Sequence, residues 1–158
     1  MHTLKRVFQC IAAILITFTA GAIGSLATVP NIPTWYAGLE KPPLLPPNEV
    51  FGPTWSALYV LIGISLFLVW IAKEKKSFIK TYLPFYIQLG LNALWSIVFF
   101  GLHLPWVGCI VILLLISAII WTILTFKNYS KVSAWLLIPY LTWVAFATYL
   151  TFGVAILN

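Results

Sequence analysis

Polar and aromatic side chains at helical spacing are the residues of this sequence best suited to bind a ligand. Gln88, Asn92 and Ser96 recur every four residues inside an apolar segment, so a helix there carries all three on one face. Trp95 and Phe99 flank that face. An amide in apolar surroundings costs of order 2–7 kcal/mol unless it is hydrogen-bonded. Two interpretations stay open, namely hydrogen bonds between helices and contact with a ligand. We favour bonds between helices for Gln88, and we weigh the two interpretations equally for Asn92.

Two further apolar segments carry aromatic rings at helical spacing. In "FGPTWSALY", Trp55 and Tyr59 lie four residues apart and share a helix face. In "LLIPYLTWVAFATYL", Tyr140, Trp143 and Ala147 run down one side, and the small Ala147 leaves room beside the indole. Aromatic rings stack on flat molecules with about 1 kcal/mol per ring. We therefore expect a planar, apolar ligand between these segments, although packing within the core explains the same rings.

The sequence lacks the groups that most hydrolases and metalloproteins use. It has no Asp, and His2 and His103 lie outside the apolar segments. A Ser–His–Asp triad is therefore impossible, two separated histidines supply no metal cluster, and no phosphate-binding glycine motif is present. Proton-coupled transporters place carboxylates within the membrane, and none of the apolar segments carries one. We expect no metal site and no required cofactor.

The composition indicates a membrane protein. The 158 residues are 62% hydrophobic and only 8% charged, against about 25% charged in soluble domains. Five apolar runs are long enough to cross a bilayer, where the backbone must be helical. The sequence predicts a single domain, residues 1–158: an all-α integral membrane protein whose five-helix bundle has a long proline-rich loop after the first helix. The expected spans are residues 6–28, 51–72, 81–101, 106–126 and 133–156.

Small residues recur every four positions in the first span, at Ala13, Thr17, Gly21 and Ser25. This stripe is typical of close packing between membrane helices, so we assign it a packing role and no ligand role. The span also follows two basic residues, as a secretory signal peptide does. Its apolar run of about 20 residues exceeds the usual 7–15, which favours a retained helix.

The basic residues are distributed unequally between the two ends of the spans. The positive-inside rule then places the N-terminus in the cytoplasm and the C-terminus and the 30–53 loop outside, in what we expect to be a bacterial plasma membrane. Basic clusters between the spans account for the net charge of +6. No basic motif indicates binding of nucleic acid. Lys41 alone lies on the outer side, and the cytoplasmic side receives Lys5, Arg6, Lys73, Lys75, Lys76, Lys80, Lys127 and Lys131.

The proline-rich 30–53 loop is a candidate lid. At 1.5 Å per helical residue, the aromatic clusters of the second, third and fifth spans all fall in the outer half of the bundle, beneath this loop. Prolines restrict φ in advance, so little entropy is lost when the loop closes. Trp35 and Tyr36 are positioned in the sequence to hang from the loop over a ligand.

Several segments resemble the translocator protein (TspO/MBR) family, also called tryptophan-rich sensory proteins or peripheral-type benzodiazepine receptors. They are "AGAIGSLAT", "WYAGLEKPPLLPP", "FGPTWSALYVL", "QLGLNALWSIVFFGLH" and "LLIPYLTWVAFATYL", and they cover almost the whole chain in order. The resemblance implies a five-helix bundle, usually a homodimer, that binds porphyrins, notably protoporphyrin, and isoquinoline-carboxamide or benzodiazepine-type drugs.

The family motifs and the helical spacing together predict the ligand contacts. The resemblance implies ligand contacts for Tyr36 and Pro47 of the loop. It implies further contacts from the second, third and fifth spans, namely Trp55, Asn92, Trp95, Ser96, Trp143 and Ala147. The complete expected set is Tyr36, Pro47, Trp55, Tyr59, Gln88, Asn92, Trp95, Ser96, Phe99, Tyr140, Trp143, Phe146 and Ala147.

The chain departs from the family pattern at two places. Many relatives have Asn where this chain has Thr151. Animal members carry a basic residue after the C-terminal tyrosines, in a proposed cholesterol motif, whereas Tyr149 is followed by "LTFGVAILN". Such motifs are weak indicators even when intact, so we expect no sterol recognition there.

Three functions are consistent with these features. The first is a membrane receptor or carrier for tetrapyrroles of the protoporphyrin or haem type, active in tetrapyrrole or stress regulation. The second is an enzyme that degrades porphyrin in light, with Trp55 or Trp143 as the redox-active neighbour. The third is a membrane scaffold that acts through partners and keeps a vestigial pocket.

Overall fold

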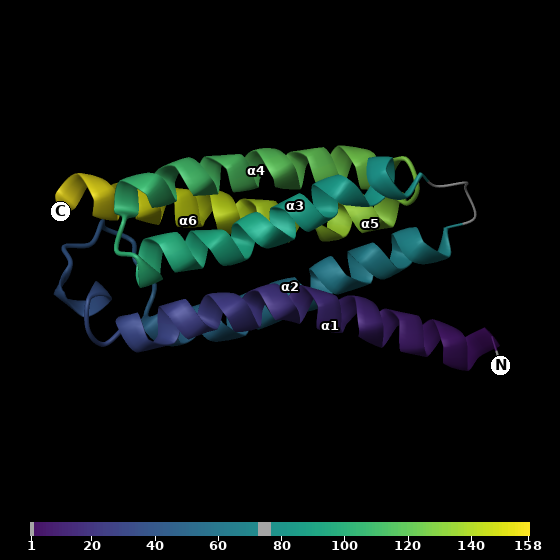
Figure 1. Ribbon diagram of the computed structural model, residues 1–158, viewed down its shortest axis with the longest axis horizontal. Helices are drawn as coiled ribbons and strands as arrows, with labels where there is room; N and C mark the ends of the chain where they lie inside the picture. Colours follow the sequence, from purple (N-terminus) through teal and green to yellow (C-terminus); the bar gives the residue numbers. More distant parts are fainter. Residues whose placement is uncertain (1, 73–76) are drawn as a thin grey trace.

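The computed structural model describes residues 2–72 and 77–158, and the chain forms a long helical bundle (Figure 1). The first span is α1 (His2–Thr28), and α2 (Asn48–Ile71) follows a connector. The third span joins α3 (Phe78–Ser96) to a π-helical turn, η3 (Ile97–Gly101). The remaining helices are α4 (Pro105–Lys127), α5 (Lys131–Leu136) and α6 (Ile138–Leu157).

Five helical stretches are long and apolar enough to cross a membrane, and the described residues contain no strand. The prediction of an all-helical membrane protein with five spans is confirmed in that respect. Three of the basic residues counted for orientation, Lys73, Lys75 and Lys76, lie outside the described residues. The stretches are Thr3–Asn31, Asn48–Ile71, Phe78–Gly101, Pro105–Lys127 and Lys131–Leu157.

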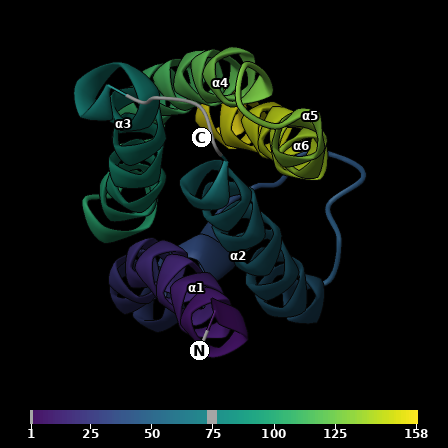
Figure 2. The same cartoon turned by 90° about the vertical axis from the view of Figure 1, so that its right-hand side faces the viewer.

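The five spans form a ring when viewed along the bundle (Figure 2). α1 packs on α2 and α3, α4 packs on α3 and α6, and α2 packs on α5. By contrast, α2 contacts α6 only sparsely. The fifth span is therefore held against α2 mainly through its first part, α5, and the two spans part toward the end of the bundle that holds the connector.

The fifth span is interrupted where Pro139 enters it. Proline has no N–H to donate and its ring clashes with the carbonyl four residues earlier, which disrupts a helix. α5 ends at Leu136, Leu137 separates the two helices, and α6 begins at Ile138. The predicted 133–156 helix is thus two helices, although together they remain one span.

The connector, residues 29–47, is shorter than the predicted 30–53 loop. It contains two 3₁₀ turns, η1 (Val29–Asn31) and η2 (Tyr36–Gly38), and α2 already begins at Asn48. Pro53 lies inside α2, close to its start, where a missing N–H removes only one hydrogen bond. Residues 48–53 are therefore helical, which corrects the loop boundary expected from the prolines.

The connector is fastened to α6. The Tyr149 hydroxyl donates to the carbonyl of Pro43 at 2.7 Å. The side chain of Asn158 bonds the backbone of Glu40 twice, accepting from its N–H and donating to its carbonyl, both at 3.0 Å. A Cβ added to Gly153 would lie 2.5 Å from Pro42, so that glycine allows the connector to lie directly on the helix.

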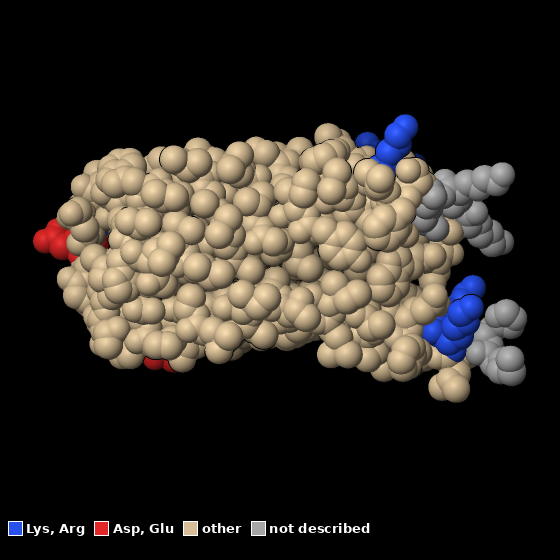
Figure 3. Space-filling view, in the orientation of Figure 1, with Lys and Arg blue, Asp and Glu red and all other residues tan. Residues whose placement is uncertain are grey.

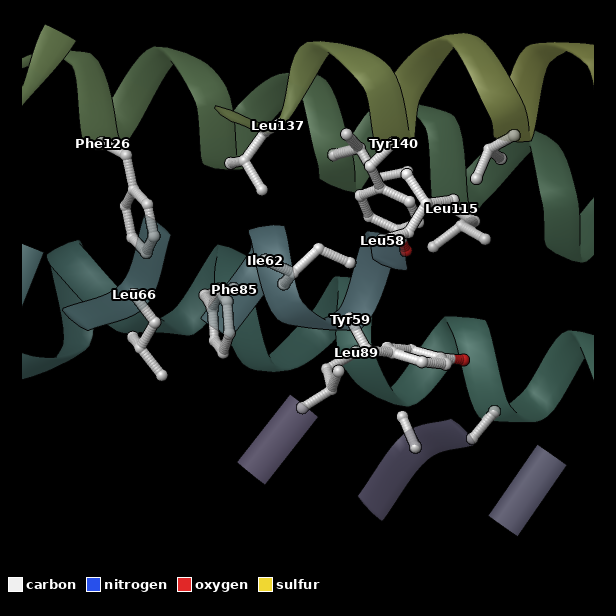
Figure 4. Close-up of a cluster of buried hydrophobic side chains, with 14 of the residues drawn as sticks. Leu58, Tyr59, Ile62, Leu66, Phe85, Leu89, Leu115, Phe126, Leu137 and Tyr140 are labelled. Carbon is white, nitrogen blue, oxygen red and sulfur yellow. The ribbon is translucent and has the colours of Figure 1, made fainter. Parts of the chain in front are cut away.

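The core lies between α2, α3, α4 and α6 (Figure 4). Its fully buried side chains include Ile62, Leu66, Phe85, Leu115 and Phe126. Phe85 and Phe126 stack with ring centroids 5.7 Å apart. Between membrane helices such side chains associate through van der Waals contacts rather than through removal from water, so the close packing of this cluster fixes how α2, α3, α4 and α6 meet.

Small residues and a hydrogen bond bring α1 close to α2. Ala13 and Thr17 are fully buried, and the Thr17 hydroxyl donates to the carbonyl of Tyr59 at 2.7 Å. A Cβ on Gly63 would lie 2.6 Å from the Cα of Ile14, which means that the two backbones approach closely there. The predicted packing role of the small-residue stripe is observed for its first three members, because a Cβ on Gly21 would lie 2.5 Å from the ring of Tyr59.

Candidate ligand-binding cavity

A cavity of about 660 Å³ lies beneath the connector. Small-molecule sites in proteins have volumes of about 300–1,000 Å³. Its walls come from α1, α2, α3 with η3, and α6, and the connector contributes Val29, Ile32 and Tyr36. The lining is predominantly apolar, so the cavity suits a hydrophobic molecule.

Nine of the thirteen residues expected to contact a ligand line this cavity. They come from the connector and three different spans, which confirms that the aromatic clusters converge, as the depth argument predicted. They are Tyr36, Trp55, Tyr59, Asn92, Trp95, Ser96, Phe99, Trp143 and Ala147.

The other four expected residues, Pro47, Gln88, Tyr140 and Phe146, do not line the cavity. Gln88 and Tyr140 are each 1% exposed and lie behind the wall, where they bond each other. Pro47 precedes the first turn of α2, and Phe146 lies on α6 with its ring against Trp143 and Tyr149. Helical spacing placed Gln88 and Tyr140 on the correct elements but did not distinguish the cavity wall from the layer behind it.

Sequence reasoning missed the contribution of α1. Gly21 and Ser25, which belong to the small-residue stripe, line the cavity together with Phe18, Ala22 and Gly24. A Cβ on Gly21 would lie 2.5 Å from the ring of Tyr59. The stripe was thus a usable signal, because small side chains equally allow a helix or a ligand to approach.

Stacked aromatic pairs form two walls of the cavity. Trp55 and Tyr59 of α2 stack at 5.6 Å with an interplanar angle of 27°. Trp95 and Phe99 of the third span stack at 5.4 Å and 17°. Such pairs stabilise a protein by about 0.5–1.5 kcal/mol beyond the area that they bury, so they hold the rings in fixed orientations.

A third aromatic pair belongs to the α6 side of the cavity. Trp143 meets Phe51 of α2 edge to face, with centroids 5.7 Å apart. Phe51 was not predicted as a site residue, although it precedes Trp55 by four residues and the helical spacing was a usable signal for it. This pair spans the place where α2 and α6 otherwise contact each other sparsely.

A buried chain of hydrogen bonds supports the aromatic walls. The Tyr59 hydroxyl donates to Asn92 Oδ1 at 2.7 Å, and Asn92 Nδ2 donates to the Tyr140 oxygen at 3.1 Å. The Tyr140 hydroxyl donates in turn to Gln88 Oε1 at 2.9 Å. Asn92 therefore bonds between helices, as one interpretation predicted, and it also lines the cavity, where contact with a ligand stays a prediction.

Three buried donors have no partner within the described protein: Gln88 Nε2, Trp95 Nε1 and Trp143 Nε1. An unpaired buried polar group costs about 1–3 kcal/mol. The two indoles line the cavity, but their nitrogens are turned into the packing and not toward the open space. In this conformation the cavity therefore presents the faces and edges of the indoles rather than their N–H groups.

Aromatic contacts hold the connector over the cavity. Tyr36 packs against Phe99 and Phe100, and Trp35 stacks on His103 with centroids 4.5 Å apart. His103 Nε2 lies 2.8 Å from Asn31 Oδ1, which ties the η1 turn to the segment before α4. Burial raises the pKa of the Tyr36 phenol above its ordinary value, so the ring keeps its proton to a higher pH than a free phenol does.

The geometry defines the class of protein first: a five-helix membrane protein with an aromatic, ligand-sized cavity under a fastened connector. The TspO/MBR family profile matches residues 13–157. "Tryptophan-rich protein TspO" of Archaeoglobus fulgidus is 45% identical over 97% of this chain and 99% of its own length. The human "Translocator protein" is 40% identical over 76% of this chain and 72% of its own length.

"Tryptophan-rich protein TspO" of Chlorobaculum tepidum is also similar, with 37% identity over 98% of each chain. The chain therefore belongs to the TspO/MBR family, and the resemblance inferred from its sequence motifs is confirmed.

Proposed function

We propose that this protein is a membrane receptor or carrier that binds a tetrapyrrole, such as protoporphyrin, or a drug-like planar molecule in the cavity, and that it acts in tetrapyrrole or stress regulation. The observation that carries the proposal is the convergence of Trp55, Trp95 and Trp143 from three spans on one apolar space. Flat macrocycles gain stacking and burial energy in such a space. Asn92 and Ser96 are two of the polar residues in the lining, and they are the ones that we propose to orient the edge of the macrocycle.

A titration tests this proposal. Purified protein in lipid nanodiscs is titrated with protoporphyrin in the dark, and quenching of tryptophan fluorescence is followed. We expect saturable quenching, and weaker binding in Trp95→Ala and Trp143→Ala. Trp135→Ala is the matched control, because that indole is exposed on α5 and does not line the cavity. A scaffold with a vestigial pocket would show no saturable quenching.

Light-dependent degradation of porphyrin is a second candidate function. It is favoured by the position of the indoles of Trp55 and Trp143 on the cavity lining, where both would be neighbours of a bound pigment. Repeating the titration under illumination separates the two functions. A new absorbing product that disappears in Trp55→Phe or Trp143→Phe supports the enzyme, whereas saturable binding without a product supports a receptor. Transport requires, in addition, flux into vesicles.

We also propose that the N-terminus is cytoplasmic, that the connector and the C-terminus are outside, and that the protein forms a homodimer in the membrane. The charge distribution supports the orientation, since Lys and Arg atoms gather at one end of the bundle and Glu atoms at the other (Figure 3). Reporter fusions at each terminus test the orientation. Cross-linking in native membranes tests the dimer, and a product of monomer size alone would refute it.

A further inference from the structure

The lining of the cavity is unevenly charged. Among the described residues that line it, Glu49 is the only one with a charged side chain. Glu49 lies in the first turn of α2 and is exposed at the rim, beside Asn48 and Gly52. A carboxylate at this point sets the electrostatic potential that an entering molecule meets.

The connector carries one basic residue, Lys41. Lys41 does not line the cavity. Its Nζ donates to the carbonyls of Leu39 at 3.0 Å and Ala37 at 3.4 Å, and it lies 4.9 Å from the centroid of the Tyr36 ring. The ammonium keeps its positive charge, but the connector holds it outside the lining, so a carboxylate that enters the cavity finds no lining cation to pair with among the described residues.

The start of α2 offsets the charge of Glu49 only in part. A helix N-terminus carries a partial charge of about +0.5, which favours the acidic residue in the first turn. The carboxylate contributes a full negative charge, so the lining itself opposes anions at this rim. Charges within about 10 Å interact appreciably at low and moderate salt.

We propose that Glu49 is a specificity-determining residue, which makes the cavity select planar ligands whose entering edge is neutral or cationic over ligands that present carboxylates there. This inference rests on the proposed tetrapyrrole-binding function and narrows its ligand class. Tetrapyrroles with esterified or absent carboxylates bind more tightly than the corresponding dicarboxylic acids. A dicarboxylic tetrapyrrole binds with its acidic edge turned away from Glu49.

The test compares two ligands that share one ring system. Protoporphyrin and its dimethyl ester are titrated into the full-length protein in zwitterionic nanodiscs at low salt, and the ratio of their dissociation constants is the measured quantity. Glu49→Gln removes the charge and keeps the shape. We expect it to lower the ratio of acid to ester dissociation constants by about three- to ten-fold.

Glu40→Gln is the matched control. Glu40 lies in the connector at the same end of the molecule but does not line the cavity, and its bonds to Asn158 come from its backbone. We expect the ratio in Glu40→Gln to equal that of the unmodified protein. Raising the salt concentration should narrow the unmodified protein's preference for the ester, because screening weakens the field of Glu49.

The outcomes separate the inference from the proposed function. If both ligands bind saturably but Glu49→Gln leaves the ratio unchanged, or Glu40→Gln changes it equally, the inference is wrong and the proposed function stands. If neither ligand binds saturably, the proposed function fails and the inference fails with it. A ratio that falls only in Glu49→Gln supports both.

Discussion

The hydroxyl of Tyr59 donates a hydrogen bond of 2.7 Å to Oδ1 of Asn92, and this bond joins the cavity wall on α2 to the third span. Both residues line the cavity, and Asn92 continues the chain of bonds to Tyr140. The wall that would meet a ligand is thus held by the same bonds that connect the helices. Binding and stability should respond together to changes along this chain.

Replacing Tyr59 with Phe should destabilise the protein by about 1–3 kcal/mol, because Asn92 Oδ1 loses its donor in a buried site. The stacking ring against Trp55 is retained. Denaturant unfolding in detergent, followed by circular dichroism, measures the change. Tyr86→Phe, on an exposed face of α3, is the control and should have little effect. Equal stability of the two variants would show that the bond contributes nothing.

Gly63→Ala should separate α1 from α2. The added Cβ would lie 2.6 Å from backbone Cα of Ile14, which cannot move as a side-chain tip can. Overpacking of this kind costs about 1–3 kcal/mol. Gly90→Ala is the matched control in α3, since its Cβ meets nothing within 4 Å and alanine is the better helix former by about 1 kcal/mol. Thermal unfolding of the two variants should shift in opposite directions.

Alkaline pH should loosen the connector through Tyr36. Because burial raises the pKa of this phenol in the folded state, the folded protein holds the proton more tightly than the unfolded chain does. The resulting stability is complete below the ordinary value of about 10 and declines as the pH rises above it. Limited proteolysis of the connector across this range measures the effect. Tyr36→Phe should lack the additional alkaline sensitivity, and an identical pH profile would refute the assignment.

Asn158→Ala should free the connector from α6 without changing the spans. The substitution removes both bonds from the side chain to the backbone of Glu40. Each such bond contributes about 0.5–1.5 kcal/mol, so we expect faster proteolytic cleavage in residues 39–47 and little change in the global unfolding midpoint. Asn128→Ala is the control, because Asn128 caps the C-terminal end of α4 and has no side-chain bond to the connector among the described residues. Unchanged cleavage would mean that Tyr149 and the Pro42 contact suffice to hold the connector.

The spans and the aromatic clusters were predictable from the sequence, and the depth of each residue in the wall was not. Gln88, Asn92 and Ser96 share one helix face, yet Gln88 is buried against Tyr140 while Asn92 and Ser96 line the cavity. Periodicity identifies a face, but only the neighbouring helices determine whether that face meets a side chain or a space. The same limit explains why Tyr140 was expected in the cavity.

The sequence by itself determined that lipid surrounds the spans and that the spans are helical. Apolar runs of about 20 residues with few charges cross a bilayer as helices, because lipid offers no partner for free backbone groups. Only the tertiary structure decided that the small-residue stripe of α1 packs tightly at Ala13 and Thr17, that Gly21 both packs against Tyr59 and borders the cavity, and that Ser25 lines the cavity. The physical reason is that small side chains permit close approach equally to a helix and to a ligand. Which of the two occupies the space depends on how far the facing helices have parted.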